Sequence, residues 1–131
     1  MTDKKVTDKT NVAVSQYKKT DAILMDWQSS ANKHEIKAAY EAITELLDAT
    51  ESPTYVVVDL RKNRYMPFAP TLKGALFGPH RHNKLMAWLV IGENAFASSV
   101  AEMLDRLTNM EKILWFKDES EVDTFLYENK K

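Results

Sequence analysis

A continuous apolar run from Thr54 to Leu60 most constrains what this chain can fold into. It contains three consecutive valines, and Asp59 stands just before its end. Runs of this length that are rich in β-branched residues are typical of a strand buried on both faces. A second run spans 85–91 and a shorter one spans 113–116. The runs predict the buried centre of an α/β sheet, whose functional groups gather beyond the carboxyl ends of the strands.

Amphipathic segments with clear start signals predict four helices. Asn32 and Glu35 have the spacing of a capping box, and Asp118 starts the last helix in the same way. A short helix is expected from Pro70 to Phe77, ahead of a Gly-Pro stop signal. A helix capped by Asn94 is expected to bury Phe96, Val100, Met103, Leu104 and Leu107.

The start of the chain predicts a hairpin. Residues 11–17 alternate between apolar and polar side chains, and 22–27 are more apolar. The order β-β-α-β-α-β-α-β-α predicts an α/β fold with a mixed, mostly parallel sheet of about five strands and four helices. We expect a flexible tail over 1–10 and a single domain over 11–131.

Composition excludes several classes of function. A formal net charge of −1 argues against a nucleic-acid partner. The absence of cysteine excludes disulfides, thiolate catalysis and cysteine-based zinc sites. The first residues lack the apolar core of a signal peptide, and no run approaches membrane-spanning length. We therefore expect a cytoplasmic protein without stable membrane insertion.

These features resemble the SpoIIAA-like proteins, a bacterial branch of the STAS superfamily. The resemblance covers residues 11–128 and is carried by the strands 56–60 and 85–92 and by the closing stretch 115–121. It implies a superhelix of successive βα turns, with the N-terminal hairpin on the same sheet. It also implies one of two uses: a phosphorylation switch, as in anti-sigma-factor antagonists, or an enclosed apolar ligand, as in the related CRAL-TRIO lipid-transfer domains.

The chain departs from this family at the switch. The resemblance places the phosphorylated serine of the family near Pro67 to Pro70, where no side chain carries a hydroxyl. Thr71 is the nearest hydroxyl, and a phosphate at a helix start would meet free N–H groups. We expect the switch to be lost, with Thr71 as the alternative phosphoacceptor.

The segment after the first buried strand holds most of the candidate binding residues. Asp59 either faces a ligand or accepts hydrogen bonds from the following turn, paired with Arg61 or Arg64. Residues 65–70 are unusually apolar for a connection. They either cover the core or form a dimer patch or pocket rim.

Two histidines and three tryptophans complete the candidates. His80 and His82 have the spacing of residues that point the same way on an extended segment, but no further metal ligand accompanies them. We expect no metal there and interpret the segment as a solvated basic turn, with anion binding near Arg61 and Arg64 as the alternative. The tryptophans at 27, 88 and 115 lie within strands and are expected to pack in the core.

No catalytic motif is present, so we expect a protein that is not an enzyme and carries no cofactor. The leading hypothesis is a non-catalytic interaction or regulatory module that binds a protein partner or itself as a homodimer. The alternative is a carrier or sensor of a small apolar ligand beside residues 59–77, in a cavity lined by Phe68, Leu72, Leu76 and Phe77. An enzyme that uses Asp59 with a histidine is a third hypothesis. The candidate binding residues are Asp59, Arg61, Arg64, Tyr65, Phe68, Thr71, Leu72, Phe77, His80 and His82.

Overall fold

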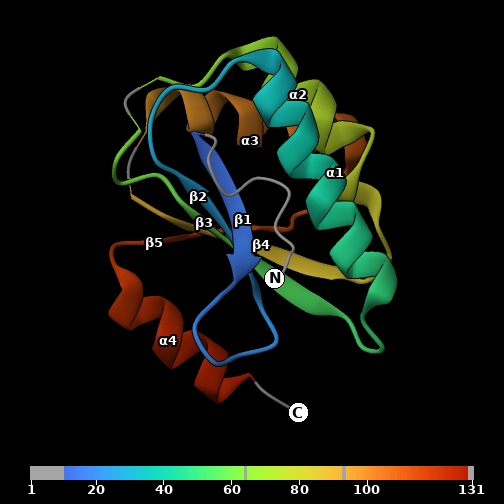
Figure 1. The fold of residues 1–131 in the computed structure, drawn as a ribbon, viewed down its shortest axis with the longest axis vertical. Coiled ribbons are helices and arrows are strands. Elements are labelled where there is room, and N and C mark those ends of the chain that lie inside the picture. Colours follow the sequence, from blue (N-terminus) through green and yellow to red (C-terminus); the bar gives the residue numbers. More distant parts are fainter. Residues whose placement is uncertain (1–10, 64, 93, 130–131) are drawn as a thin grey trace.

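The computed structural model describes residues 11–63, 65–92 and 94–129, which form one five-stranded sheet with helices on both faces (Figure 1). The strand order follows the chain, β1-β2-β3-β4-β5. Within the described part of the chain, β1 and β2 pair antiparallel, and the other neighbouring strands pair parallel. The predicted α/β fold and hairpin are confirmed, whereas the predicted tail lies outside the described residues. The strands are β1 (Val12–Gln16), β2 (Ile23–Trp27), β3 (Thr54–Asp59), β4 (Leu85–Ile91) and β5 (Ile113–Phe116).

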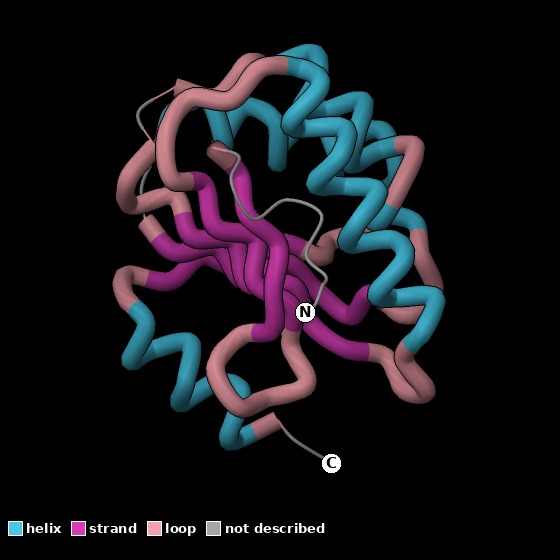
Figure 2. Tube along the Cα trace, viewed as in Figure 1, coloured by secondary structure: helices cyan, strands magenta, loops and turns pink. Residues whose placement is uncertain are grey.

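Three helices cover one face of the sheet and one helix covers the other. When neighbouring parallel strands follow one another in the chain, right-handed crossovers place every connecting helix on the same side. Accordingly α1, α2 and α3 lie together, and α4 packs on the opposite face (Figures 1 and 2). The helices are α1 (Lys33–Ala49), α2 (Phe68–Leu76), α3 (Ala95–Thr108) and α4 (Glu119–Glu128), with a short 3₁₀ turn at Pro79–Arg81.

Side-chain caps fix three of the helix starts. The carboxylate of Glu35 accepts from the N–H of Asn32, and the amide oxygen of Asn32 accepts from the N–H of Glu35. Asn94 caps α3 and Asp118 caps α4, as predicted. The reciprocal bond is missing in α4, because the carboxylate of Glu121 accepts from the N–H of Lys117. These caps satisfy N–H groups that a helix start otherwise leaves free.

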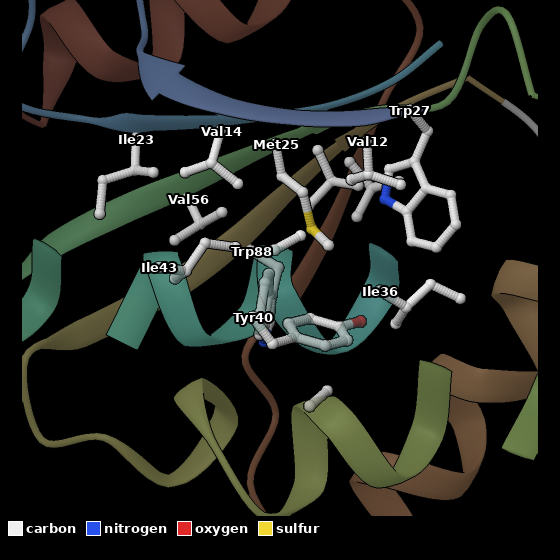
Figure 3. Packing of buried hydrophobic residues seen from close by; sticks show 14 of the residues in the cluster. Val12, Val14, Ile23, Met25, Trp27, Ile36, Tyr40, Ile43, Val56 and Trp88 are labelled. Carbon is white, nitrogen blue, oxygen red and sulfur yellow. The ribbon is translucent and has the colours of Figure 1, made fainter. Parts of the chain in front are cut away.

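The larger core lies between the sheet and α1–α3. Trp27, Met25 and Trp88 project from the sheet toward Ile36 and Tyr40 of α1 (Figure 3). A smaller cluster fills the other face, where Val57 and Leu89 meet Val122 of α4. The central strands β3 and β4 are therefore buried on both faces, as their unbroken apolar sequences predict.

Three expectations about burial and boundaries were wrong. On α3 the predicted burial of Val100 and Leu104 is confirmed, but Phe96 and Leu107 are exposed, and Ala97 and Ala101 complete the inner face. Strand β5 is an edge strand with two exposed residues rather than a buried strand. Helix α2 begins at Phe68 and not at Pro70, because proline fits the first turn of a helix, where its missing N–H is not needed.

Among the described residues, no helix combines the length and the apolar character that a membrane crossing requires.

Candidate functional site

Asp59 is held by the turn that follows it. Its Oδ1 accepts from the backbone N–H of Arg61 at 3.1 Å and from Nε of that residue at 3.0 Å, while Oδ2 accepts from a terminal guanidinium nitrogen at 2.7 Å. Burial alone raises the pKa of Asp59, but the hydrogen bonds and charge of Arg61 outweigh it and hold the pKa below its usual value. The prediction of a turn-capping aspartate paired with Arg61 is confirmed. Arg64 lies outside the described residues.

Arg61 extends this contact to the opposite face of the sheet. Its guanidinium also donates to Glu119 at the start of α4, at 2.8 Å. Lys18, in the β1–β2 turn, bonds Glu119 at 3.2 Å and Asp123 at 2.7 Å. A chain of ion pairs therefore fastens α4 to two strand ends, which is a structural role for these charges.

The apolar segment 65–70 divides between the interior and the surface. Met66 is buried in the larger core, whereas Tyr65 is 48% exposed and Phe68 is 40% exposed. The Tyr65 ring packs edge-on against Phe96 of α3, with centroids 4.9 Å apart. The segment thus both completes the core and presents aromatic rings at the carboxyl end of the sheet.

A cavity of about 60 Å³ lies within the larger core, next to this segment. The sheet forms its floor, and α2 and α3 form most of its roof. All three tryptophans of the chain contribute to its wall. The lining residues are Met25, Trp27, Tyr40, Val58, Leu60, Met66, Thr71, Ala75, Trp88, Val90, Ala97, Val100, Ala101, Leu104, Ile113 and Trp115.

The wall is apolar apart from a few side chains. Among the described residues that line it, Tyr40 is the single ionisable one, and burial raises the pKa of its hydroxyl, which therefore stays neutral. Trp115 is the most exposed lining residue, with 44% of its surface accessible. The part of the wall that is most exposed to solvent therefore lies on the edge strand β5.

None of the four residues predicted to line a cavity does so, and that prediction was wrong. Thr71 lines the cavity and is 2% exposed, so its hydroxyl is not presented to a kinase. Phe68, Leu72 and Leu76 do not line it, although the two leucines pack against the larger core. Phe77 is 81% exposed and lies away from it. The sequence did not predict that the three tryptophans line one cavity. They lie on three different strands, and only the pairing register of these strands brings their side chains together.

His80 is buried and hydrogen-bonds two other elements of the fold. Its interpretation as part of a solvated turn was wrong. The side chain is fully buried, and its Nδ1 accepts from Nε1 of Trp88 at 3.0 Å. Its Nε2 therefore carries the proton and donates to the hydroxyl of Thr108 at 3.2 Å. Burial, with the nearby charges of Lys112 and Arg81, lowers the pKa of His80 to about 4.

His82 points elsewhere and does not form a site with His80. Its Nε2 bonds Asp48 at 2.7 Å, and its Nδ1 accepts from the backbone N–H of Lys84. Leu85, at the start of β4, pairs with Thr54, whereas Asp59 pairs with the other end of β4. The histidines and Arg61 therefore lie at opposite ends of the sheet, and the expected proximity was wrong. No cluster of potential metal ligands occurs within the part of the chain that the structure describes.

The architecture is shared with a solved protein. A DUF3478-family protein with a SpoIIAA-like fold from Shewanella loihica PV-4, described as uncharacterized, superposes with a TM-score of 0.61 and 9% identity. The match covers 88% of this chain and 91% of that one. No family profile matches the sequence, and no curated protein matches it significantly. The SpoIIAA-like fold that the sequence resemblance implied is confirmed.

Proposed function

We propose that this SpoIIAA-like fold serves as a non-catalytic binding module for a small, largely apolar ligand held in the tryptophan-walled cavity. The apolar cavity beside residues 59–77 carries the proposal. Ligand sites of this kind are concave and mostly apolar, with few polar groups. Native cores are otherwise packed with few voids larger than a water molecule.

The size of the cavity limits the ligand. Its volume of about 60 Å³ is less than half of the roughly 150 Å³ that an engineered apolar cavity offers to benzene. A ring-sized ligand therefore requires the wall to move. Met66 is unbranched and flexible, and Trp115 stands on an edge strand with solvent on one side, so these two residues are the natural movable parts.

The polar groups nearby support binding rather than catalysis. Both oxygens of Asp59 accept from Arg61, and both ring nitrogens of His80 are engaged inside the fold. None of these groups lines the cavity. A general acid or base must reach the reacting atom within hydrogen-bond distance, and these residues are placed to hold the fold instead.

The test is whether a small apolar probe enters the cavity. Cyclopentane is titrated into ¹⁵N-labelled protein while the three tryptophan indole N–H signals are followed, and we expect saturable shifts. Ala101→Leu places a larger side chain in the cavity wall and should abolish these shifts while the fold is retained. Ala49→Leu makes the same change at an exposed position on α1 and should leave them unchanged.

Absence of any saturable shift in the native protein, or equal binding by Ala101→Leu, would overturn the proposal. Circular dichroism of each variant establishes that loss of binding does not reflect loss of the fold.

A second candidate function is association through the exposed aromatic rings. Tyr65, Phe68 and Phe96 are each at least 40% exposed, and Tyr65 and Phe96 pack together at the carboxyl end of the sheet. Exposed apolar patches often mark protein interfaces. Light scattering after size exclusion tests this function. A dimer that Tyr65→Ser together with Phe96→Ser converts to a monomer would support it, and a native monomer at high concentration would refute self-association.

A further inference from the structure

Two polar groups on residues of the cavity wall have no hydrogen-bond partner within the protein. They are Nε1 of Trp27 and Oγ1 of Thr71, and their lack of a partner holds among the described residues. The two residues are 1% and 2% exposed. Buried polar groups are nearly always paired in native proteins, because leaving one unpaired is unfavourable. Two unpaired groups on residues around one small cavity point to a polar feature of the molecule that enters it.

Thr71 differs from two other helical threonines of the chain. The hydroxyls of Thr44 and Thr108 donate to the carbonyl oxygen four residues earlier, at 3.0 and 2.6 Å. A threonine hydroxyl within a helix commonly donates to this carbonyl oxygen. For Thr71 the corresponding residue is Pro67, whose carbonyl accepts from the backbone N–H of Thr71 at 3.3 Å. The hydroxyl itself is left available on a residue that lines the cavity.

The wall offers no charge that could balance an ionic ligand. None of the described residues that line the cavity is lysine, arginine, histidine, aspartate or glutamate. A carboxylate or an ammonium group that entered would lose its hydration and gain no counter-ion. Ionised molecules, including fatty-acid anions, are therefore disfavoured.

We propose that the cavity selects an uncharged ligand that presents one oxygen acceptor, a carbonyl or hydroxyl oxygen, on an otherwise apolar body. The indole N–H of Trp27 can only donate, so the ligand must accept. The hydroxyl of Thr71 can donate to the same oxygen or accept from a ligand hydroxyl. This inference rests on the proposed ligand-binding function and adds the chemical class of the ligand.

The test compares three probes of similar size: cyclopentane, cyclopentanone and cyclopentanecarboxylate at neutral pH. Each is titrated into ¹⁵N-labelled protein. Cyclopentanone should bind at least as tightly as cyclopentane, although it is less hydrophobic, and should move the Trp27 indole N–H signal downfield. The Trp88 indole already donates to His80 and serves as the internal reference. The carboxylate should not bind.

Two variants examine the polar contacts separately. Trp27→Phe keeps an aromatic ring and removes the donor, so affinity for cyclopentanone should fall about five-fold while cyclopentane binding persists. Thr71→Val should weaken cyclopentanone binding similarly and stabilise the empty protein, because it removes an unpaired hydroxyl. Thr44→Val is the matched control, since it removes a paired hydroxyl: it should destabilise the protein and leave probe binding unchanged.

The outcomes separate the two proposals. If cyclopentane binds and cyclopentanone binds more weakly than it does, ligand binding stands and the acceptor inference fails. Binding of the carboxylate at comparable affinity also overturns the inference, as does a cyclopentanone affinity that neither variant changes. If the Trp27 indole signal does not shift while the ketone binds, the ketone oxygen does not accept from this N–H, and the inference is overturned. If no probe binds at all, the proposed function itself fails.

Discussion

His80 links three elements of the fold through one neutral imidazole ring. It accepts from Trp88 of β4 and donates to Thr108 at the end of α3, so either a proton on Nδ1 or a change of tautomer breaks a buried bond. The unfolded chain takes up this proton near pH 6.5, whereas folded His80 resists protonation until about pH 4. The stability that this group contributes is therefore complete above pH 6.5 and is lost as the pH falls toward 4.

We predict that the free energy of unfolding falls by up to roughly 3 kcal/mol over this range because of His80. Chemical denaturation at a series of pH values measures it. His80→Gln should lack this part of the pH dependence, and His34→Gln, at an exposed position, should keep it. Parallel pH profiles for His80→Gln and the native protein would contradict the assignment.

Single residues show which predictions sequence patterns can support. The bond between Asp59 and Arg61 spans two residues, so a local pattern predicts it. The burial of His80 depends on residues eight and twenty-eight positions away, and the adjacent Pro79 and Arg81 do not indicate it. The cavity contacts of Trp27 and Thr71 likewise arise from elements that meet only in the folded chain. Contacts made across the fold leave no local signal.

At the scale of elements, α2 lies unusually close to α1. A methyl group added at Gly74 would stand 2.3 Å from a ring carbon of Tyr40. Tyr40 is buried and packs edge-on against Trp88, so its ring has little freedom to retreat. The glycine is therefore required by packing, even though glycine weakens a helix relative to alanine.

We predict that Gly74→Ala destabilises the protein by about 1–3 kcal/mol, the usual result of overpacking, despite a propensity gain of about 1 kcal/mol. Lys73→Ala, at the exposed neighbouring position, should change stability by less than about 0.5 kcal/mol. Thermal and denaturant unfolding measure both. A stabilised Gly74→Ala variant would show that α2 can move away from α1 at little cost.

Three of the four helix starts were predicted correctly, and helix faces were predicted less well. The caps at Asn32, Asn94 and Asp118 depend on residues within one turn, which is why sequence alone located them. Helical spacing and side-chain size predict Phe96 and Leu107 on the inner face of α3. The structure buries Ala97 and Ala101 in their place, and these two small residues line the cavity.

At the scale of the whole molecule, the two faces of the sheet are covered unequally. Three helices close one face, while α4 is held by Val122, two partly buried side chains and surface ion pairs. Each exposed ion pair contributes little. The more thinly covered face should therefore open first.

We predict that backbone amides of α4 exchange with solvent faster than those of α1 under native conditions. Val122→Ala should accelerate exchange selectively in α4, because it removes a fully buried contact there. Val100→Ala, a matched truncation in the larger core, should lower overall stability without that selectivity. Hydrogen exchange followed by mass spectrometry measures this, and equal protection of α1 and α4 would contradict it.

The strand order has a consequence for how the chain acquires its structure during synthesis. Because every strand pairs with its neighbours in the chain, none has to be inserted between two strands that are already paired. When a strand leaves the ribosome, the preceding strand, with which it pairs, has already been synthesised. The sheet can therefore grow from the hairpin in the direction of translation. Closure of long loops, which slows the folding of many sheets, is therefore limited here to one helical connection at a time.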